Sequence, residues 1–180
     1  TFLPNFVPYR LAAMATDPTS LEPVLVPVGA NPARVFGLDA ETRLRRLGEK
    51  AGIEFADRWQ SDRPAILADL AFAWDPAWLK EIRARAGTVV MKGGRAVLAH
   101  VPADADAAPL AAAMAAGAAW TGAGLEQLDA DTAELSNSEL RKRERPFVLP
   151  LDPADPEPVE RAAYDASYKG VTDVLTLYLW

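Results

Sequence analysis

The chain has 180 residues, 50% of them hydrophobic and 24% charged, which is typical of one globular domain with a hydrophobic core. Its formal net charge of −6 argues against a nucleic-acid partner, because an acidic chain has no basic face that displaces counterions from phosphates. The absence of cysteine excludes a disulfide framework, a thiolate metal site and a cysteine nucleophile.

The first half of the chain alternates short apolar runs with helical patterns. The predicted elements are, in chain order, a strand over 23–28, a loop over 29–37, a helix over 39–51, a strand over 64–68 and a helix over 76–86. Asp39 and Asp75 each precede a helical pattern and are the predicted N-caps. Gly52 is predicted to end the first helix.

The second half continues the alternation. Its predicted elements are strands over 88–92 and 96–101, helices over 107–116 and 137–144, and a strand over 147–149. Gly93 and Gly94 lie between the first two of these strands and predict a tight hairpin. Strands that alternate with helices favour an α/β fold of three layers with a mostly parallel sheet. We therefore predict an α/β domain over residues 1–150.

Residues 151–180 differ from the rest, because a Pro-rich hinge precedes a helical pattern. Residues 174–180 are apolar nearly all round, and such a helix needs a protein core or a bilayer to cover it. We interpret the hinge and helix as leading toward a membrane domain, with Lys169 near the plane of the headgroups and Asp173 on the same helix face. The alternatives are that these two charges are solvated, and that the helix packs on its own domain or on a second copy.

The loop after the first strand is a candidate phosphate site. In an α/β domain this loop lies at the carboxyl edge of the sheet, and the following helix presents free backbone N–H groups there. The candidate nucleotide-binding residues of this loop and of the helix that follows are Gly29, Asn31, Arg34, Gly37 and Arg43. The alternative is an ordinary loop with a solvated arginine.

Two carboxylates are candidate metal ligands. Asp69 and Asp152 each follow a predicted strand, where an α/β sheet places its ligands. Carboxylates together with nucleotide phosphates are the oxygen ligands that Mg²⁺ prefers. The alternative is that each aspartate caps a turn, as aspartates commonly do. His100 is the only histidine and closes a strand pattern, so we expect it to be structural.

The order of these predicted strands, helices and candidate residues resembles the sugar-nucleotidyltransferase fold, which is of the Rossmann-like type. The stretch LPLDPADPEPVERAAYDASYKGVTD resembles the exit of this domain in proteins that fuse a cytidylyltransferase to a membrane CDP-alcohol phosphatidyltransferase. In the resemblance, Asp152 and Asp155 match a late metal-binding motif, and Lys169 with Asp173 match a pair just before the first membrane helix. The resemblance implies a transferase of phospholipid biosynthesis at the cytoplasmic face of the bacterial inner membrane, with CTP or a CDP-alcohol as ligand and Mg²⁺ in the parent enzyme.

The phosphate loop departs from the pattern of active members. Those carry G-x-G-x-R and a downstream lysine, whereas this loop has no G-x-G pair and no lysine before Lys50. We therefore expect a degenerate nucleotidyltransferase domain that is not catalytic alone. Two alternatives stay open: an active cytidylyltransferase that forms a CDP-alcohol, and a non-catalytic binding module that forms a homodimer.

Overall fold

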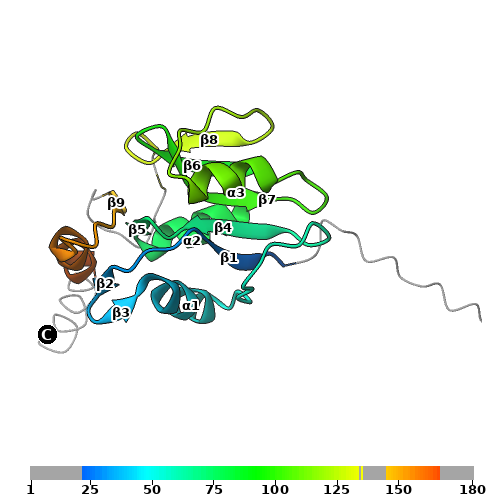
Figure 1. The fold of residues 1–180 in the computed structure, drawn as a ribbon. Helices are drawn as coiled ribbons and strands as arrows, with labels where there is room; N and C mark the ends of the chain where they lie inside the picture. Colours follow the sequence, from blue (N-terminus) through cyan, green and yellow to red (C-terminus); the bar gives the residue numbers. More distant parts are fainter. Residues whose placement is uncertain (1–21, 134, 136–144, 167–180) are drawn as a thin grey trace, which may run out of the picture.

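The computed structural model of the chain describes residues 22–133, 135 and 145–166 (Figure 1). Its named elements are β1 (Val24–Val28), β2 (Arg34–Val35), β3 (Leu38–Asp39), α1 (Ala40–Ala51), β4 (Ala65–Asp69), β5 (Phe72–Trp74), α2 (Pro76–Ala84), β6 (Thr88–Lys92), β7 (Arg95–Val101), α3 (Ala108–Ala115), β8 (Glu126–Asp129) and β9 (Val148–Pro150). Residues 157–166 form a further helix.

The central sheet has five strands in the order β1-β4-β7-β6-β8. β1 is parallel to β4, and β6 is parallel to β8, whereas β7 is antiparallel to both β4 and β6. Four of the five strands therefore run in one direction, and β7 is reversed by the hairpin at Gly93 and Gly94. The sheet is mixed and mostly parallel, and the predicted hairpin is confirmed.

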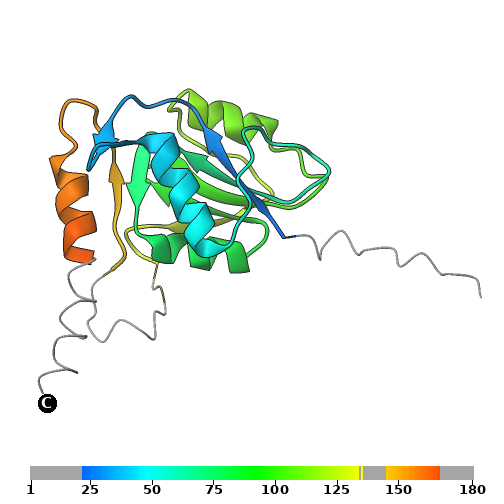
Figure 2. The same cartoon turned by 90° about the horizontal axis from the view of Figure 1, so that it is seen from below.

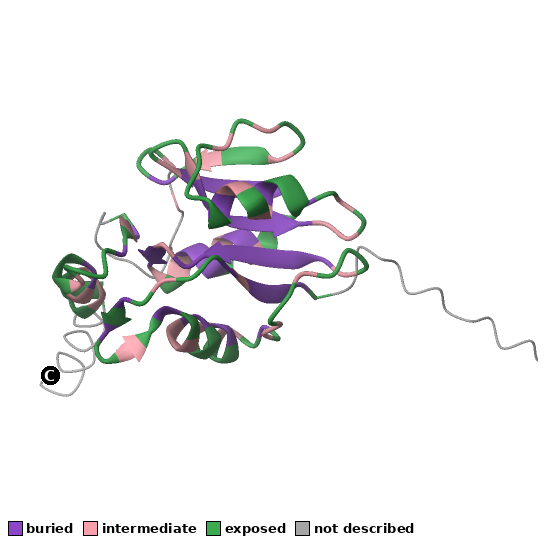
Figure 3. Cartoon of the chain, viewed as in Figure 1, coloured by how far each residue is buried: buried purple, intermediate pink, exposed green. Residues whose placement is uncertain are grey.

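Helices cover both faces of this sheet, as the view in Figure 2 shows. α1 and α2 lie on one face and α3 lies on the other. β1 shows how a strand serves both layers: Val24, Val26 and Val28 pack in the core under α3, whereas Leu25 packs under α1 and α2. Such alternation follows from the two-residue period of a strand. The predicted three-layer α/β architecture is confirmed, and the buried strands form its centre (Figure 3).

The elements differ from the prediction in several respects. The predicted strand 147–149 is β9, but it pairs with β5 in a separate two-stranded sheet rather than joining the central one. β8 was not predicted, because Glu126–Asp129 is polar and mostly exposed. The predicted loop 29–37 contains part of the β2–β3 hairpin. The predicted helix 137–144 lies outside the described residues.

The segment after β9 contributes to the domain core. Leu151 and Val159 are buried in the cluster that lies under α1 and α2. The helix over 157–166 agrees with the start of the predicted C-terminal helix. Lys169, Asp173 and residues 174–180 lie outside the described part of the chain. Within the described residues, no helix has the length and apolar character needed to cross a bilayer.

Candidate functional site

The carboxyl edge of the sheet brings together residues from four strands. Gly29 follows β1, Asp69 ends β4 and Lys92 ends β6 at this edge. Because β7 is reversed, its first residue, Arg95, lies at the same edge. Such an edge is where open α/β sheets place their ligands.

Asp69 and Arg95 form the central polar contact of this edge. Asp69 is only 2% exposed, and its Oδ2 accepts a hydrogen bond from Arg95 Nη2 at 3.0 Å. Its Oδ1 accepts the backbone N–H of Ala71 at 2.8 Å. The Arg95 guanidinium carbon also lies 4.7 Å from the centroid of the Phe72 ring. Among the described residues, the buried Nε of Arg95 has no hydrogen-bond partner.

Gly117 provides the space for this guanidinium. A Cβ at this position would lie 3.3 Å from Arg95 Nη2, closer than a side chain comfortably allows. Gly117 also has φ of +64°, in the left-handed region that glycine adopts at little cost. The left-handed φ and the close approach to Arg95 therefore both favour a glycine at this position.

Burial is the main influence on the Asp69 carboxyl. Desolvation raises its pKa above the usual value of 3.8, while the Ala71 N–H and the positive charge of Arg95 act in the opposite direction. The carboxylate is thus a buried group whose charge is only partly compensated. Its two contacts hold the end of β4 and the start of β7 together.

Asn31 joins three segments of the chain. Its Nδ2 donates to the carbonyl oxygens of Leu70 at 3.0 Å and Leu151 at 2.9 Å. Its Oδ1 accepts the backbone N–H of Ala33 at 2.9 Å. The side chain is therefore fully engaged within the domain. These bonds hold the loop beside Leu70, which follows Asp69, and beside Leu151, which precedes Asp152.

The other candidate residues, in the loop and in α1, have different surroundings. Gly29 and Gly37 both have φ of +78°, and a Cβ on Gly29 would lie 3.6 Å from Ala115 of α3. Arg34 is exposed on β2. Arg43 donates from Nη2 to the carbonyl oxygen of Trp74 at 3.2 Å, and burial lowers the pKa of its guanidinium. The structure thus directs Arg43 toward the start of α2 and leaves Arg34 on the surface.

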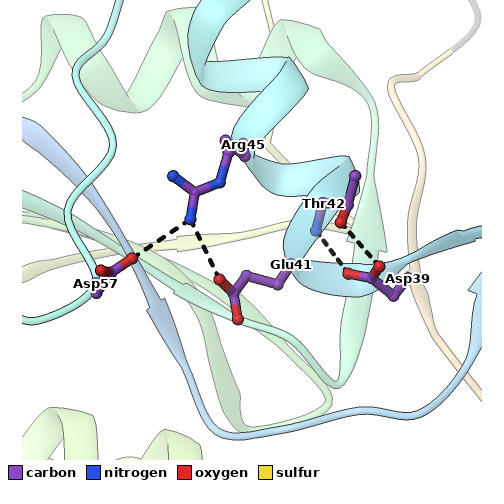
Figure 4. A network of polar contacts seen from close by, with 5 residues as sticks. All are labelled: Asp39, Glu41, Thr42, Arg45 and Asp57. Atoms are coloured by element: carbon purple, nitrogen blue, oxygen red, sulfur yellow. Dashed lines mark hydrogen bonds and ion pairs between the residues drawn. The ribbon is translucent and has the colours of Figure 1, made fainter.

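The N-terminus of α1 is already occupied by a carboxylate (Figure 4). Asp39 accepts the backbone N–H of Thr42 at 2.7 Å and its hydroxyl at 2.8 Å, which confirms the predicted cap. The Thr42 N–H is the main reason that the pKa of Asp39 is lowered. A phosphate at this helix end would have to displace an anion that the chain itself supplies.

A network on the first turns of α1 continues from this cap. Arg45 pairs with Glu41 and with Asp57, each at 3.4 Å (Figure 4). Its guanidinium carbon also lies 4.0 Å from the centroid of the Phe55 ring. Exposed ion pairs of this kind contribute little to stability. Their effect is to connect α1 with the loop that leads to β4.

The two predicted metal ligands are held in different ways. Asp152 is exposed, and its Oδ1 accepts the backbone N–H of Ala154 at 2.8 Å, which is a turn-capping contact. Asp69 already neutralises Arg95, so a cation at its carboxylate would have to break that ion pair. Within the described ranges, no three His, Cys, Asp or Glu side chains gather into a metal site. This arrangement fits Mg²⁺ poorly.

Two contacts escaped the sequence analysis. Arg95 is the partner of Asp69, and the sequence indicated only that it follows the Gly93-Gly94 hairpin, where β7 begins at the carboxyl edge. Glu160 accepts the backbone N–H of Phe36 at 2.7 Å, and because the two residues are 124 positions apart, no local sequence pattern indicated this contact. Comparison of the chain with protein-family models, curated proteins and solved structures gives no match.

Proposed function

We propose that this chain is the α/β domain of a membrane CDP-alcohol phosphotransferase of phospholipid biosynthesis. In this proposal the domain is a degenerate nucleotidyltransferase that supports the assembly of the membrane enzyme rather than catalysing a reaction. The resemblance of residues 149–173 to the exit of such domains supports the parent family. The cytoplasmic side of the inner membrane is the location that the proposal implies.

One observation carries the non-catalytic part of the proposal. Three of the candidate site residues, Asn31, Arg43 and Asp69, make contacts within the domain. Capture of a nucleotide triphosphate requires backbone N–H groups that approach the phosphates, together with cations that offset their charge. Arg95 is committed to Asp69, and Arg43 donates to a carbonyl oxygen. Arg34 is the one cation within residues 29–37.

Calorimetry on the 180-residue chain tests this part directly. We expect no measurable heat when CTP with MgCl₂ is titrated into the chain, because the groups that would bind phosphate are engaged elsewhere. The informative variants are Arg34→Ala and Asp69→Asn, with Lys50→Ala as a control that changes an exposed charge on α1. Micromolar binding that Arg34→Ala abolishes and Lys50→Ala leaves intact would support the active cytidylyltransferase instead.

The parent activity is tested in membranes that contain the full-length protein. We expect transfer of a phosphoalcohol from a CDP-alcohol to a lipid acceptor, and we expect Asp69→Asn to leave it largely unchanged. Absence of transfer, combined with a stable dimer of the 180-residue chain in sedimentation, would favour the third hypothesis of a binding module.

A further inference from the structure

The tip of the β2–β3 hairpin holds an aromatic side chain in an unfavourable backbone conformation. Phe36 and Gly37 are its central residues, with φ of +48° and +78°. Positive φ at both positions is typical of a type I′ turn, in which Asn-Gly is favoured. A bulky residue with positive φ is a true outlier. Despite this, Phe36 is 61% exposed, so burial in its own domain offers little compensation.

A second exposed aromatic residue lies on the helix that contacts this hairpin. Tyr164 is 57% exposed, and Phe36 and Tyr164 are the exposed large hydrophobic side chains of the described residues. Glu160 lies one helical turn before Tyr164, on the same side of helix 157–166. Its Oε1 accepts the Phe36 N–H at 2.7 Å and so fixes the helix against the hairpin. Figures 1 and 2 show the hairpin and this helix side by side at one end of the molecule.

We propose that Phe36 and Tyr164, here called the aromatic tip, contact the interfacial region of a lipid bilayer. This inference rests on the proposed function, in which the domain lies beside a membrane. Aromatic side chains are enriched at the boundary between headgroups and acyl chains. The sequence that follows this helix also contains an apolar stretch, residues 174–180. The aromatic tip would therefore set how the domain is oriented on the membrane.

The size of the aromatic tip favours a bilayer over a second protein copy. A buried Phe or Tyr covers about 150–250 Å². Two such residues, each a little over half exposed, therefore offer roughly 200–300 Å². A stable protein interface buries about 800 Å² on each partner. Interfacial insertion needs no minimum area of this kind, because each apolar side chain adds its own partition energy.

The charges around the aromatic tip predict which lipids it contacts. Both exposed arginines near the aromatic tip have an acidic neighbour: Arg34 lies near Asp39, and Arg161 lies near Glu157. Positive charge is therefore not in excess. Binding to anionic lipids needs such an excess. Contact with a zwitterionic surface through apolar side chains is the mode that fits.

The test uses the fact that the chain has no cysteine, so that single labelling sites can be introduced. The variants Phe36→Cys and Tyr164→Cys are labelled with an environment-sensitive fluorophore, and Lys80→Cys on the exposed side of α2 is the matched control. Each is mixed with phosphatidylcholine vesicles, and with vesicles in which a third of the lipid is phosphatidylglycerol. We expect a blue shift and brighter emission at 36 and 164, no change at 80, and no stronger response with the anionic vesicles.

A binding measurement on unlabelled variants complements the fluorescence. Phe36→Asn suits the turn, so the variant is expected to unfold at the same or higher denaturant concentration than the original chain. With phosphatidylcholine vesicles, we expect its partition coefficient to fall about tenfold. The variant Lys80→Ser should bind as the original chain does.

The failures of the two proposals are distinguishable. Vesicle binding without a change at position 36, or no vesicle binding, would overturn the aromatic tip and leave the transfer activity of the full-length protein untouched. A fluorescence change that depends on protein concentration in the absence of vesicles would instead identify a contact between two copies. Loss of transfer activity in the full-length protein, with the expected fluorescence changes intact, would overturn the proposed function alone.

Discussion

At the scale of single residues, the carboxylate of Asp69 fits the sequence pattern of a metal ligand, and in the structure it pairs with a guanidinium. Its position after a buried strand suggested a metal ligand, because carboxylates at this edge commonly bind cations. The structure gives it a guanidinium at 3.0 Å and a backbone N–H at 2.8 Å. A buried ion pair of this kind is weak support for stability, because desolvation opposes the attraction between the charges.

The direction of the Asp69 pKa shift gives a testable pH dependence. Because its pKa is raised in the folded state, the Asp69 carboxyl holds its proton to a higher pH in the folded chain than in the unfolded chain. The contribution of Asp69 to the free energy of unfolding therefore falls as pH rises through the folded pKa. We expect the stability of the original chain, minus that of Asp69→Asn, to decrease with pH in this window.

Urea unfolding of the original chain and of Asp69→Asn, in steps of ~0.5 pH unit between pH 3 and pH 7, measures this difference in stability. The subtraction removes groups that titrate in the opposite sense, such as Asp39 and Glu54, whose pKa values are lowered. A difference that grows with pH would show that the attraction of Arg95 outweighs desolvation.

At the scale of elements, the loop between β1 and β2 is held in place by one amide. Asn31 reaches the ends of two segments that are 39 and 120 residues away, through the carbonyl oxygens of Leu70 and Leu151. A sequence pattern shows that a polar residue follows the strand. It does not show which carbonyl groups that residue meets, because these arrive from distant parts of the chain.

Removing the two donors of Asn31 should weaken the domain. For Asn31→Asp we expect a loss of about 2 kcal/mol or more in the free energy of unfolding, because two partly buried carbonyl oxygens lose their partners. The Ala33 contact survives in this variant, since aspartate keeps the acceptor. Chemical denaturation with Asn31→Ala for comparison checks the prediction. Equal stability of Asn31→Asp and the original chain would show that water replaces both donors.

At the scale of the whole molecule, the described part of the C-terminal segment, residues 151–166, contributes side chains to the domain core. We predicted a hinge and helix over 151–180 outside the α/β domain. In the structure, Leu151 is 3% exposed and Val159 is 1% exposed, and both lie in the core cluster under α1 and α2. β9, which directly precedes this segment, pairs with β5.

Truncation tests whether residues 151–166 stabilise the domain or form a separable linker. A chain of residues 22–150 should be less stable than a chain of residues 22–166 by about 3 kcal/mol or more, because two buried aliphatic side chains are removed. Thermal and urea unfolding of the two fragments measure the difference. If residues 22–150 are as stable as residues 22–166, the hinge is a separable linker as first predicted.

The sequence by itself determined the elements that local chemistry dictates. Apolar runs bounded by Gly, Pro or Asp located β1, β4, β6 and β7, and Asp39 with Gly52 set the ends of α1. The hairpin at Gly93 and Gly94 followed from residues that adopt positive φ. These signals are readable because each depends on residues that are neighbours in the chain.

The tertiary structure decided what depends on distant neighbours. It placed β9 beside β5, paired Asp69 with Arg95, and used Glu160 to hold the Phe36 hairpin. β8 escaped the sequence analysis for a similar reason: a polar edge strand is defined by the strand that it pairs with, here β6, rather than by its own pattern. Hydrogen-bonding groups of buried or edge segments need partners, but many different partners satisfy them, and only the packed fold selects one.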